Sequence, residues 1–405
     1  MRILLSSIYP YAFMLLYLII PFDDYVRALP NLLLAGLVLT FPFVVDKKDF
    51  KKIKGVSFFL YLIFVCYLLG NSFFSDRLES DFVVINKFFL PLILVILYIP
   101  IRDFKKISKA IVFSSLAAIV FSVINIVFLI TSKNIDFQQT SVIIEGLLID
   151  RLYLGILGIL SVLVSFNSLQ KKYHPYNRYH LLNILINTLF LICIMSKIGL
   201  LVLLMLVIVH QFYSEKTAFR KIITILLAFT VAVSVFAIYS GLSNTKSDIS
   251  ETNTENTWFQ NTLTFGVRTT VWRCAVNIIT EKPSNYFGIG FAETKENLID
   301  CYKIIKDPIR RDQFLDRRYN AHNQYIDLIL GAGFIGFFLF AFFLLFTFIK
   351  NTNRYFPTAV CIMLIMYCLF ENIFHRQMGA YYAGFILIIL LLAPNITTPV
   401  LNSKE

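Results

Sequence analysis

Long apolar runs separated by short polar intervals cover most of the chain. A helix needs about 20 mostly apolar residues to cross the hydrocarbon core of a bilayer, so each run predicts one transmembrane helix. The expected spans lie near residues 3–20, 28–45, 56–71, 82–99, 109–131, 147–167, 179–195, 198–213, 221–241, 323–349, 356–371 and 378–394. The pattern therefore predicts an all-α polytopic membrane protein with about twelve transmembrane helices.

One polar interval, residues 243–322, is far longer than the others. A segment so rich in charged and amide side chains cannot cross a bilayer and must stand in water beside it. We therefore expect three parts within one membrane domain: spans one to nine in 1–242, a partly helical loop in 243–322, and spans ten to twelve with a short tail in 323–405. Any chemistry should gather at the loop.

The charge distribution gives the expected orientation. The chain has 405 residues, 58% hydrophobic and only 15% charged, with a net charge of +12. The positive charge lies in short loops between apolar runs, which excludes a nucleic-acid interface and favours a membrane protein obeying the positive-inside rule. One set of short loops and tails carries 19 Lys and Arg residues, and the opposite set carries 6. Both termini are therefore expected in the cytoplasm and the long loop outside it.

The loop itself predicts two helical segments and a turn. Apolar positions from Val271 keep helical spacing up to Glu281-Lys282-Pro283, with Arg268 at the amino end, and Gly288-Ile289-Gly290 is typical of a turn. Residues 303–319 mix cations and carboxylates, which fits a solvated amphipathic helix or a cationic surface for an anionic ligand or lipid headgroup.

The six cysteines divide by their surroundings. Cys274 and Cys301 lie in the loop and could form a disulfide in an oxidising compartment. The other four lie in apolar runs and are interpreted as small buried hydrophobic side chains, namely Cys66, Cys193, Cys361 and Cys368.

Two further groups flank the last spans. The segment Asn320–Tyr325 carries His322 into span ten, where residues 331–336 spell G-x-G-x-x-G; lacking a strand and a βαβ unit, these glycines are interpreted as helix-packing positions. After span eleven, Glu371 and His375 are spaced to share one helix face, beside Arg376. Charged groups at a membrane boundary are candidates for function. Arg151 beside Asp150 is interpreted as an interfacial ion pair.

These features together resemble a known family. Arg268 with Trp272, the Pro283–Gly290 turn, the Ala321–Tyr325 element followed by glycines, and a long loop between spans nine and ten are similar to the O-antigen ligase and polymerase superfamily. Its members are bacterial inner-membrane glycosyltransferases of the helical GT-C class. The resemblance covers the whole topology, with specific motifs near residues 265–336 and 371–379.

The resemblance implies transfer of a glycan from an undecaprenyl diphosphate carrier to a sugar hydroxyl on the periplasmic face, with inversion and without a metal, a nucleotide sugar or another cofactor. By this resemblance, the family's loop histidine corresponds to His322 and one of its arginines corresponds to Arg268. The position of a second family arginine is occupied by Lys197 in this chain. Histidine, with an ordinary pKa of about 6.5, suits a general base or an acceptor-binding role, and cations suit a diphosphate. Further binding candidates are Asn323, Glu371 and Arg376.

Several functions stay open at this point. The acceptor is lipid A-core for a ligase or a growing polysaccharide for a polymerase. A transporter or flippase for the same lipid-linked saccharide is an alternative of another class, although the spans carry few charges apart from Lys87 and Asp327. The long loop after span nine also differs from the central linker of two-half carriers. A non-catalytic assembly component would make His322 dispensable.

Overall fold

The computed structural model describes residues 2–101, 103–133, 146–170, 174–213, 222, 265–281 and 286–392. This part of the chain contains fourteen α-helices and no strand, so the predicted all-α class is confirmed. The predicted ninth span, apart from residue 222, and residues 243–264 of the long loop lie outside the described residues.

Eleven predicted apolar runs correspond to helices. Their bounds are α1 Arg2–Ile19, α2 Leu29–Val44, α3 Val56–Phe74, α4 Leu78–Tyr98, α5 Phe104–Lys133, α7 Arg151–Ser168, α8 Asn177–Cys193, α9 Lys197–Gln211, α15 Gln324–Asn351, α16 Tyr355–Phe370 and α17 Gln377–Leu392. Six spans, in α1 with its 3₁₀ extension, α3, α4, α5, α7 and α15, are long and apolar enough to cross a membrane, and α2, α9, α16 and α17 are shorter apolar helices. The chain is a multi-pass membrane protein, and the count of twelve spans stays a prediction.

Helix α17 lies at the centre of the bundle. Every residue from Gly379 to Leu392 is buried, the pattern of a helix surrounded on all sides by protein. Gly384 permits the close approach of α4, because a Cβ at this position would lie 2.5 Å from a Leu94 side-chain carbon. The outer helices turn apolar side chains outward, and among them Cys66 and Cys193 are exposed, so our expectation that all four span cysteines are buried is wrong for these two.

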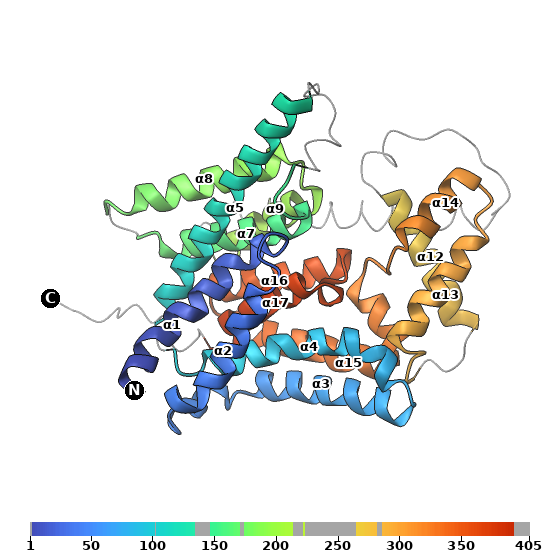
Figure 1. Cartoon of the computed structure of the whole chain (residues 1–405), viewed down its shortest axis with the longest axis horizontal. Coiled ribbons are helices and arrows are strands. Elements are labelled where there is room, and N and C mark those ends of the chain that lie inside the picture. Colours follow the sequence, from blue (N-terminus) through green and yellow to red (C-terminus); the bar gives the residue numbers. More distant parts are fainter. Residues whose placement is uncertain are drawn as a thin grey trace.

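Helices α12 (Phe265–Glu281), α13 (Phe291–Lys303) and α14 (Pro308–Arg317) form a separate group beyond one end of α3, α4 and α15 (Figure 1). The expected helix headed by Arg268 is therefore present and ends at Glu281 as predicted. The charged segment after residue 303 contains the short helix α14, and the sequence did not predict α13. Helix α1 begins at the opposite end of the bundle (Figure 1).

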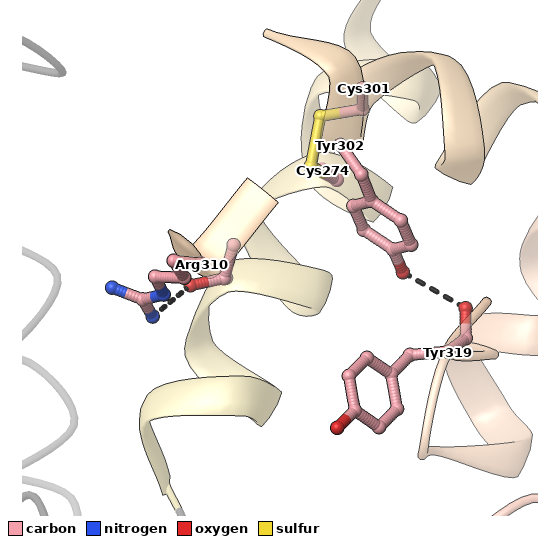
Figure 2. Close-up of a disulfide and its surroundings, with 6 residues drawn as sticks. Cys274, Cys301, Tyr302, Arg310 and Tyr319 are labelled. Atoms are coloured by element: carbon pink, nitrogen blue, oxygen red, sulfur yellow. Dashed lines mark hydrogen bonds between the residues drawn. A yellow bond between two sulfur atoms is a disulfide. The ribbon is translucent and has the colours of Figure 1, made fainter. Parts of the chain in front are cut away.

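This helical group has its own core and a disulfide. Val271, Leu298 and Phe314 meet in a small apolar cluster that is separate from the core of the bundle. Cys274 and Cys301 form a disulfide between α12 and α13, and the Tyr302 hydroxyl donates a hydrogen bond to the Tyr319 carbonyl oxygen at 3.0 Å (Figure 2). The disulfide that the sequence left open is therefore present.

The group joins the bundle where α15 is interrupted. Gly333 has φ 73° and ψ −177°, so α15 is kinked there and is not the continuous helix that we expected from the glycine pattern. A Cβ on Gly333 would lie 2.2 Å from the Tyr286 carbonyl oxygen, while the Ile289 and Gly290 amides donate to the Leu330 and Gly331 carbonyls at 2.8 and 3.0 Å. The glycines thus allow the backbone of the segment before α13 to contact the backbone of α15 directly. This contact fixes α13 against the start of α15.

Candidate active site

His322 lies just before α15 and contacts a carboxylate from the segment between α16 and α17. Its Nδ1 lies 3.0 Å from both oxygens of Glu371, 49 residues away. Its backbone has φ 44°, and its amide donates to the Asn320 side-chain oxygen at 3.1 Å. Both side chains are partly shielded, with 21% exposure for His322 and 16% for Glu371.

This contact favours one protonation arrangement of the imidazole. A carboxylate only accepts hydrogen bonds, so Nδ1 must carry the proton and donate it to Glu371. In the neutral ring, Nε2 then presents its lone pair, and this nitrogen has no hydrogen-bond partner in the described part of the chain. The pair can therefore accept a proton at Nε2 while Glu371 stabilises the resulting imidazolium.

The segment that carries Glu371 is fastened to the start of α15. The Asn323 amide donates to the Asn372 side-chain oxygen at 2.6 Å, and the Phe374 amide donates to the Gln324 side-chain oxygen at 3.1 Å. Glu371 itself has extended backbone, and Ile373–His375 is a 3₁₀ turn. Glu371 and His375 therefore do not share a helix face as we expected, because the chain leaves the helix after Phe370 to make these contacts.

A second histidine–carboxylate pair lies beside the first. His375 Nε2 is 2.8 Å from an oxygen of Asp327, whose side chain is 2% exposed. Gln324 donates to the same Asp327 oxygen at 3.4 Å, and Lys87 donates to the His375 carbonyl oxygen. The sequence identified Asp327 and Lys87 only as rare charges in the spans. Their contacts with His375 depend on tertiary structure and have no local signal.

Helix α12 brings Arg268 to the same place. Arg268 Nε donates to the Phe370 carbonyl oxygen at 3.3 Å, directly before Glu371. Trp272, one turn further along, donates from Nε1 to the Ala321 carbonyl oxygen at 3.0 Å, directly before His322. The two residues of the predicted motif therefore hold α12 against both members of the His322–Glu371 pair.

Charge and burial act together on the site. Burial lowers the pKa of Arg268, and Arg151 lowers it further, while Glu371 opposes the shift. Burial alone would raise the pKa of Glu371, but the hydrogen bond and electrostatic interaction with His322 and the charge of Arg268 together hold it below its ordinary value. Glu371 is therefore ionised at neutral pH.

Two other predicted cations have different positions. Lys197 begins α9, half-buried, within electrostatic range of Arg151 and Arg268. Arg376 is exposed and lies 3.5 Å from a carboxylate oxygen of Asp150. Asp150 also caps α7 by accepting from the Leu152 amide at 3.0 Å, so the expected ion pair between Asp150 and its neighbour Arg151 is replaced by these two contacts.

Asn323 has a structural task in this arrangement. Its side-chain oxygen accepts from the Tyr325 and Ile326 amides at 2.9 and 3.1 Å and so caps α15. The side chain is also buried. The structure thus brings His322, Arg268 and Glu371 together, places Lys197 within electrostatic range of Arg268, and uses Asn323 to orient the helix.

Among the described residues, no three His, Cys, Asp or Glu side chains gather within reach of one metal ion. The site is instead a histidine–carboxylate pair bordered by cations. Such a group can remove a proton from a hydroxyl while the cations stabilise negative charge on a leaving group.

Comparison with known proteins agrees with this chemistry. Residues 182–341 match the family model described as O-antigen ligase, a range that includes Lys197, Arg268 and His322. No curated protein matches the chain. The apolar helices identify the chain as a multi-pass membrane protein, and the match over residues 182–341 supports a relation to the O-antigen ligase and polymerase superfamily.

Proposed function

We propose that the protein is an O-antigen ligase that transfers a glycan from undecaprenyl diphosphate to a sugar hydroxyl of lipid A-core. The observation that carries this proposal is the His322–Glu371 pair beside Arg268. A base for a hydroxyl and a cation for a diphosphate are the two groups that this reaction needs.

The reaction is a single displacement. The acceptor oxygen forms a bond to the anomeric carbon of the donor glycan, while the bond between that carbon and the diphosphate oxygen breaks. The acceptor proton passes to His322 Nε2, and the electron pair of the broken bond stays on undecaprenyl diphosphate. Arg268 and Lys197 stabilise the charge on this leaving group, so the displacement needs no metal and inverts the anomeric centre.

The site is assigned to the periplasmic side of the bacterial inner membrane, with both termini in the cytoplasm. The excess of Lys and Arg in the opposite loops supports this orientation. The Cys274–Cys301 disulfide supports it independently, because disulfides persist in the oxidising periplasm and are rare in the cytosol.

The experiment is a reconstituted transfer assay. Purified protein receives an undecaprenyl diphosphate-linked glycan with either lipid A-core or a second lipid-linked glycan as acceptor. A ligase joins the glycan to lipid A-core only. Elongation of the second lipid-linked glycan alone would identify a polymerase, and bilayer crossing of the labelled donor without transfer would identify a transporter.

A further inference from the structure

A tyrosine ring lies against the imidazole of the proposed base. The ring centroids of Tyr319 and His322 are 5.6 Å apart, and the two ring planes make an angle of 50°. The buried ring of Phe314, in α14, also packs against Tyr319 in a T-shaped arrangement, with the centroids 5.1 Å apart. These two contacts support the Tyr319 ring beside the candidate active site.

The backbone between Tyr319 and His322 is fixed by the two disulfide-linked helices. The Tyr302 hydroxyl of α13 donates to the Tyr319 carbonyl oxygen at 3.0 Å (Figure 2), and Trp272 of α12 donates to the carbonyl oxygen directly before His322 at 3.0 Å. Arg318 and His322 have φ 46° and 44°, a left-handed conformation that side chains rarely adopt. Such a conformation persists where surrounding contacts enforce it, so the fold itself determines how the Tyr319 and His322 rings lie.

The Tyr319 side chain has a hydroxyl that the fold does not use. Two neighbouring tyrosines donate their hydroxyls to backbone carbonyls, Tyr302 to Tyr319 and Tyr325 to Ile365. The Tyr319 side chain is half-buried, and its hydroxyl makes no hydrogen bond within the described ranges. In Figure 2 this hydroxyl points away from Tyr302 and from the disulfide. The side chain therefore offers an apolar ring and an available polar end beside His322.

This combination suits a sugar ring. One face of a pyranose presents carbon-bound hydrogens with a slight positive charge, whereas the face of an aromatic ring is negative. The two faces therefore attract each other while they remove apolar surface from water. The sugar hydroxyls can bond to the phenolic group, which both donates and accepts hydrogen bonds.

We propose that Tyr319 binds the acceptor sugar by stacking and so places the reacting sugar hydroxyl at His322 Nε2. This inference rests on the proposed function and deepens it. The acceptor oxygen must come within about 2.6–3.2 Å of Nε2 to lose its proton there, so its sugar ring lies beside the imidazole that Tyr319 borders. The donor is held through its diphosphate at Arg268 and Lys197, whereas the acceptor needs a binding group of its own.

The first test is binding of lipid A-core, with lipid A that lacks the core sugars as the second probe. Tyr319→Leu keeps apolar bulk against Phe314 but loses the flat ring, and Tyr319→Phe loses only the hydroxyl. In nanodiscs of zwitterionic lipid, we expect Tyr319→Leu to weaken lipid A-core binding about tenfold, which corresponds to about 1.4 kcal/mol. Binding of lipid A should not change, and Tyr319→Phe should lie between wild type and Tyr319→Leu.

The matched control is Tyr286→Leu, which removes an exposed tyrosine ring from the segment before α13. Only the backbone of Tyr286 contacts Gly333, so the leucine variant should keep that contact and bind lipid A-core as wild type.

The second test separates sugar binding from support of the imidazole. Loss of a stacking residue should raise the KM for lipid A-core and leave the KM for the donor and the pH profile of kcat unchanged. Loss of support for His322 would instead shift the pH profile, because this profile reports the pKa of the base. Steady-state transfer by wild type, Tyr319→Leu and Tyr286→Leu measures all three quantities.

Wild-type affinity for lipid A-core in a folded Tyr319→Leu variant would overturn the proposal. Equal weakening of lipid A and lipid A-core binding would also overturn it, because the effect would then not depend on the sugars. A shifted pH profile with an unchanged KM for lipid A-core would assign Tyr319 to His322 alone. If lipid A-core binding depends on Tyr319 while the wild type transfers no glycan to lipid A-core, the proposed function fails and the sugar site stands.

Discussion

Glu371 holds the Nδ1 side of His322 through both carboxylate oxygens, each 3.0 Å away. The two residues are separated by 49 positions: His322 precedes α15, and Glu371 lies between α16 and α17. The contact fixes the ring orientation and leaves Nε2 to receive a proton. In our account, this pair is the base of the transfer reaction, and Glu371 orients and stabilises it.

Glu371→Gln tests the carboxylate by activity and by pH. The amide keeps the shape but loses the charge that stabilises an imidazolium, so the transfer rate should fall at least about tenfold. The variant should also lose about 1–3 kcal/mol of stability at pH 7, because a partly buried hydrogen-bonded charge is removed.

The pH dependence of that stability difference has a defined sign. Because the pKa of Glu371 is held below its ordinary value of about 4.3, its contribution is complete above that pH and is lost as the pH falls through the lower folded value. Thermal unfolding of both proteins from pH 7 to pH 3 measures this. A difference in Tm that does not shrink on acidification would contradict the assignment.

Gly333→Ala should strongly destabilise the protein. Its positive φ and extended ψ are strained for alanine, and the added Cβ would lie 2.2 Å from a backbone oxygen. Gly36→Ala in α2 is the matched control, because a Cβ there meets nothing within 4 Å. The folded yield and the Tm in detergent measure the effect. Equal Tm values for the two variants would contradict the close backbone contact between Gly333 and Tyr286.

Asp327→Asn tests the second histidine–carboxylate pair as a positioning device. The substitution should weaken the interaction with His375 and so displace Glu371. We therefore expect a lower kcat and a shifted pH profile of kcat, with the KM for the donor nearly unchanged. Asp81→Asn is the control: Asp81 is equally buried at 2% and accepts from the Ala292 amide at 2.9 Å, away from His322. If both variants lose stability and neither changes the pH profile, Asp327 is purely structural.

Replacing Cys274 and Cys301 with Ala should loosen α12 against α13. Closing the 27-residue separation is worth about 3–4 kcal/mol in the chain-entropy account, so Tm should fall, and activity should fall with it because α12 carries Arg268. Maleimide labelling of intact cells, with and without prior reduction, tests the bond and its side. Labelling of both cysteines without reduction would contradict the disulfide.

The sequence predicted the helices well because each apolar run must satisfy its own backbone hydrogen bonds within the membrane. The break between the predicted spans at 179–195 and 198–213 and the end of α12 at Glu281 could also be predicted from the sequence. The kink at Gly333 was not, because glycine permits a helix as readily as a break, and only the approach of Tyr286 decides between them.

The site was predicted in part for a similar reason. His322 and Arg268 lie in local motifs, so residue order alone could identify them. Arg151 was interpreted as the partner of its neighbour Asp150, and the structure gives that carboxylate to a helix cap and to Arg376. Contacts such as Asp327 with His375 arise where separate helices meet and leave no periodic trace in the sequence.

The most direct test of the account is glycan transfer by His322→Ala in the reconstituted assay, with His174→Ala as the control. His174 lies in the segment between the end of α7 and the start of α8. The site lies near the start of α7, so His174 is at the other end of this helix. Both variants should insert and fold. We predict that His322→Ala loses about 10²–10⁴-fold in transfer rate while His174→Ala keeps wild-type activity. Wild-type transfer by folded His322→Ala would contradict the central claim.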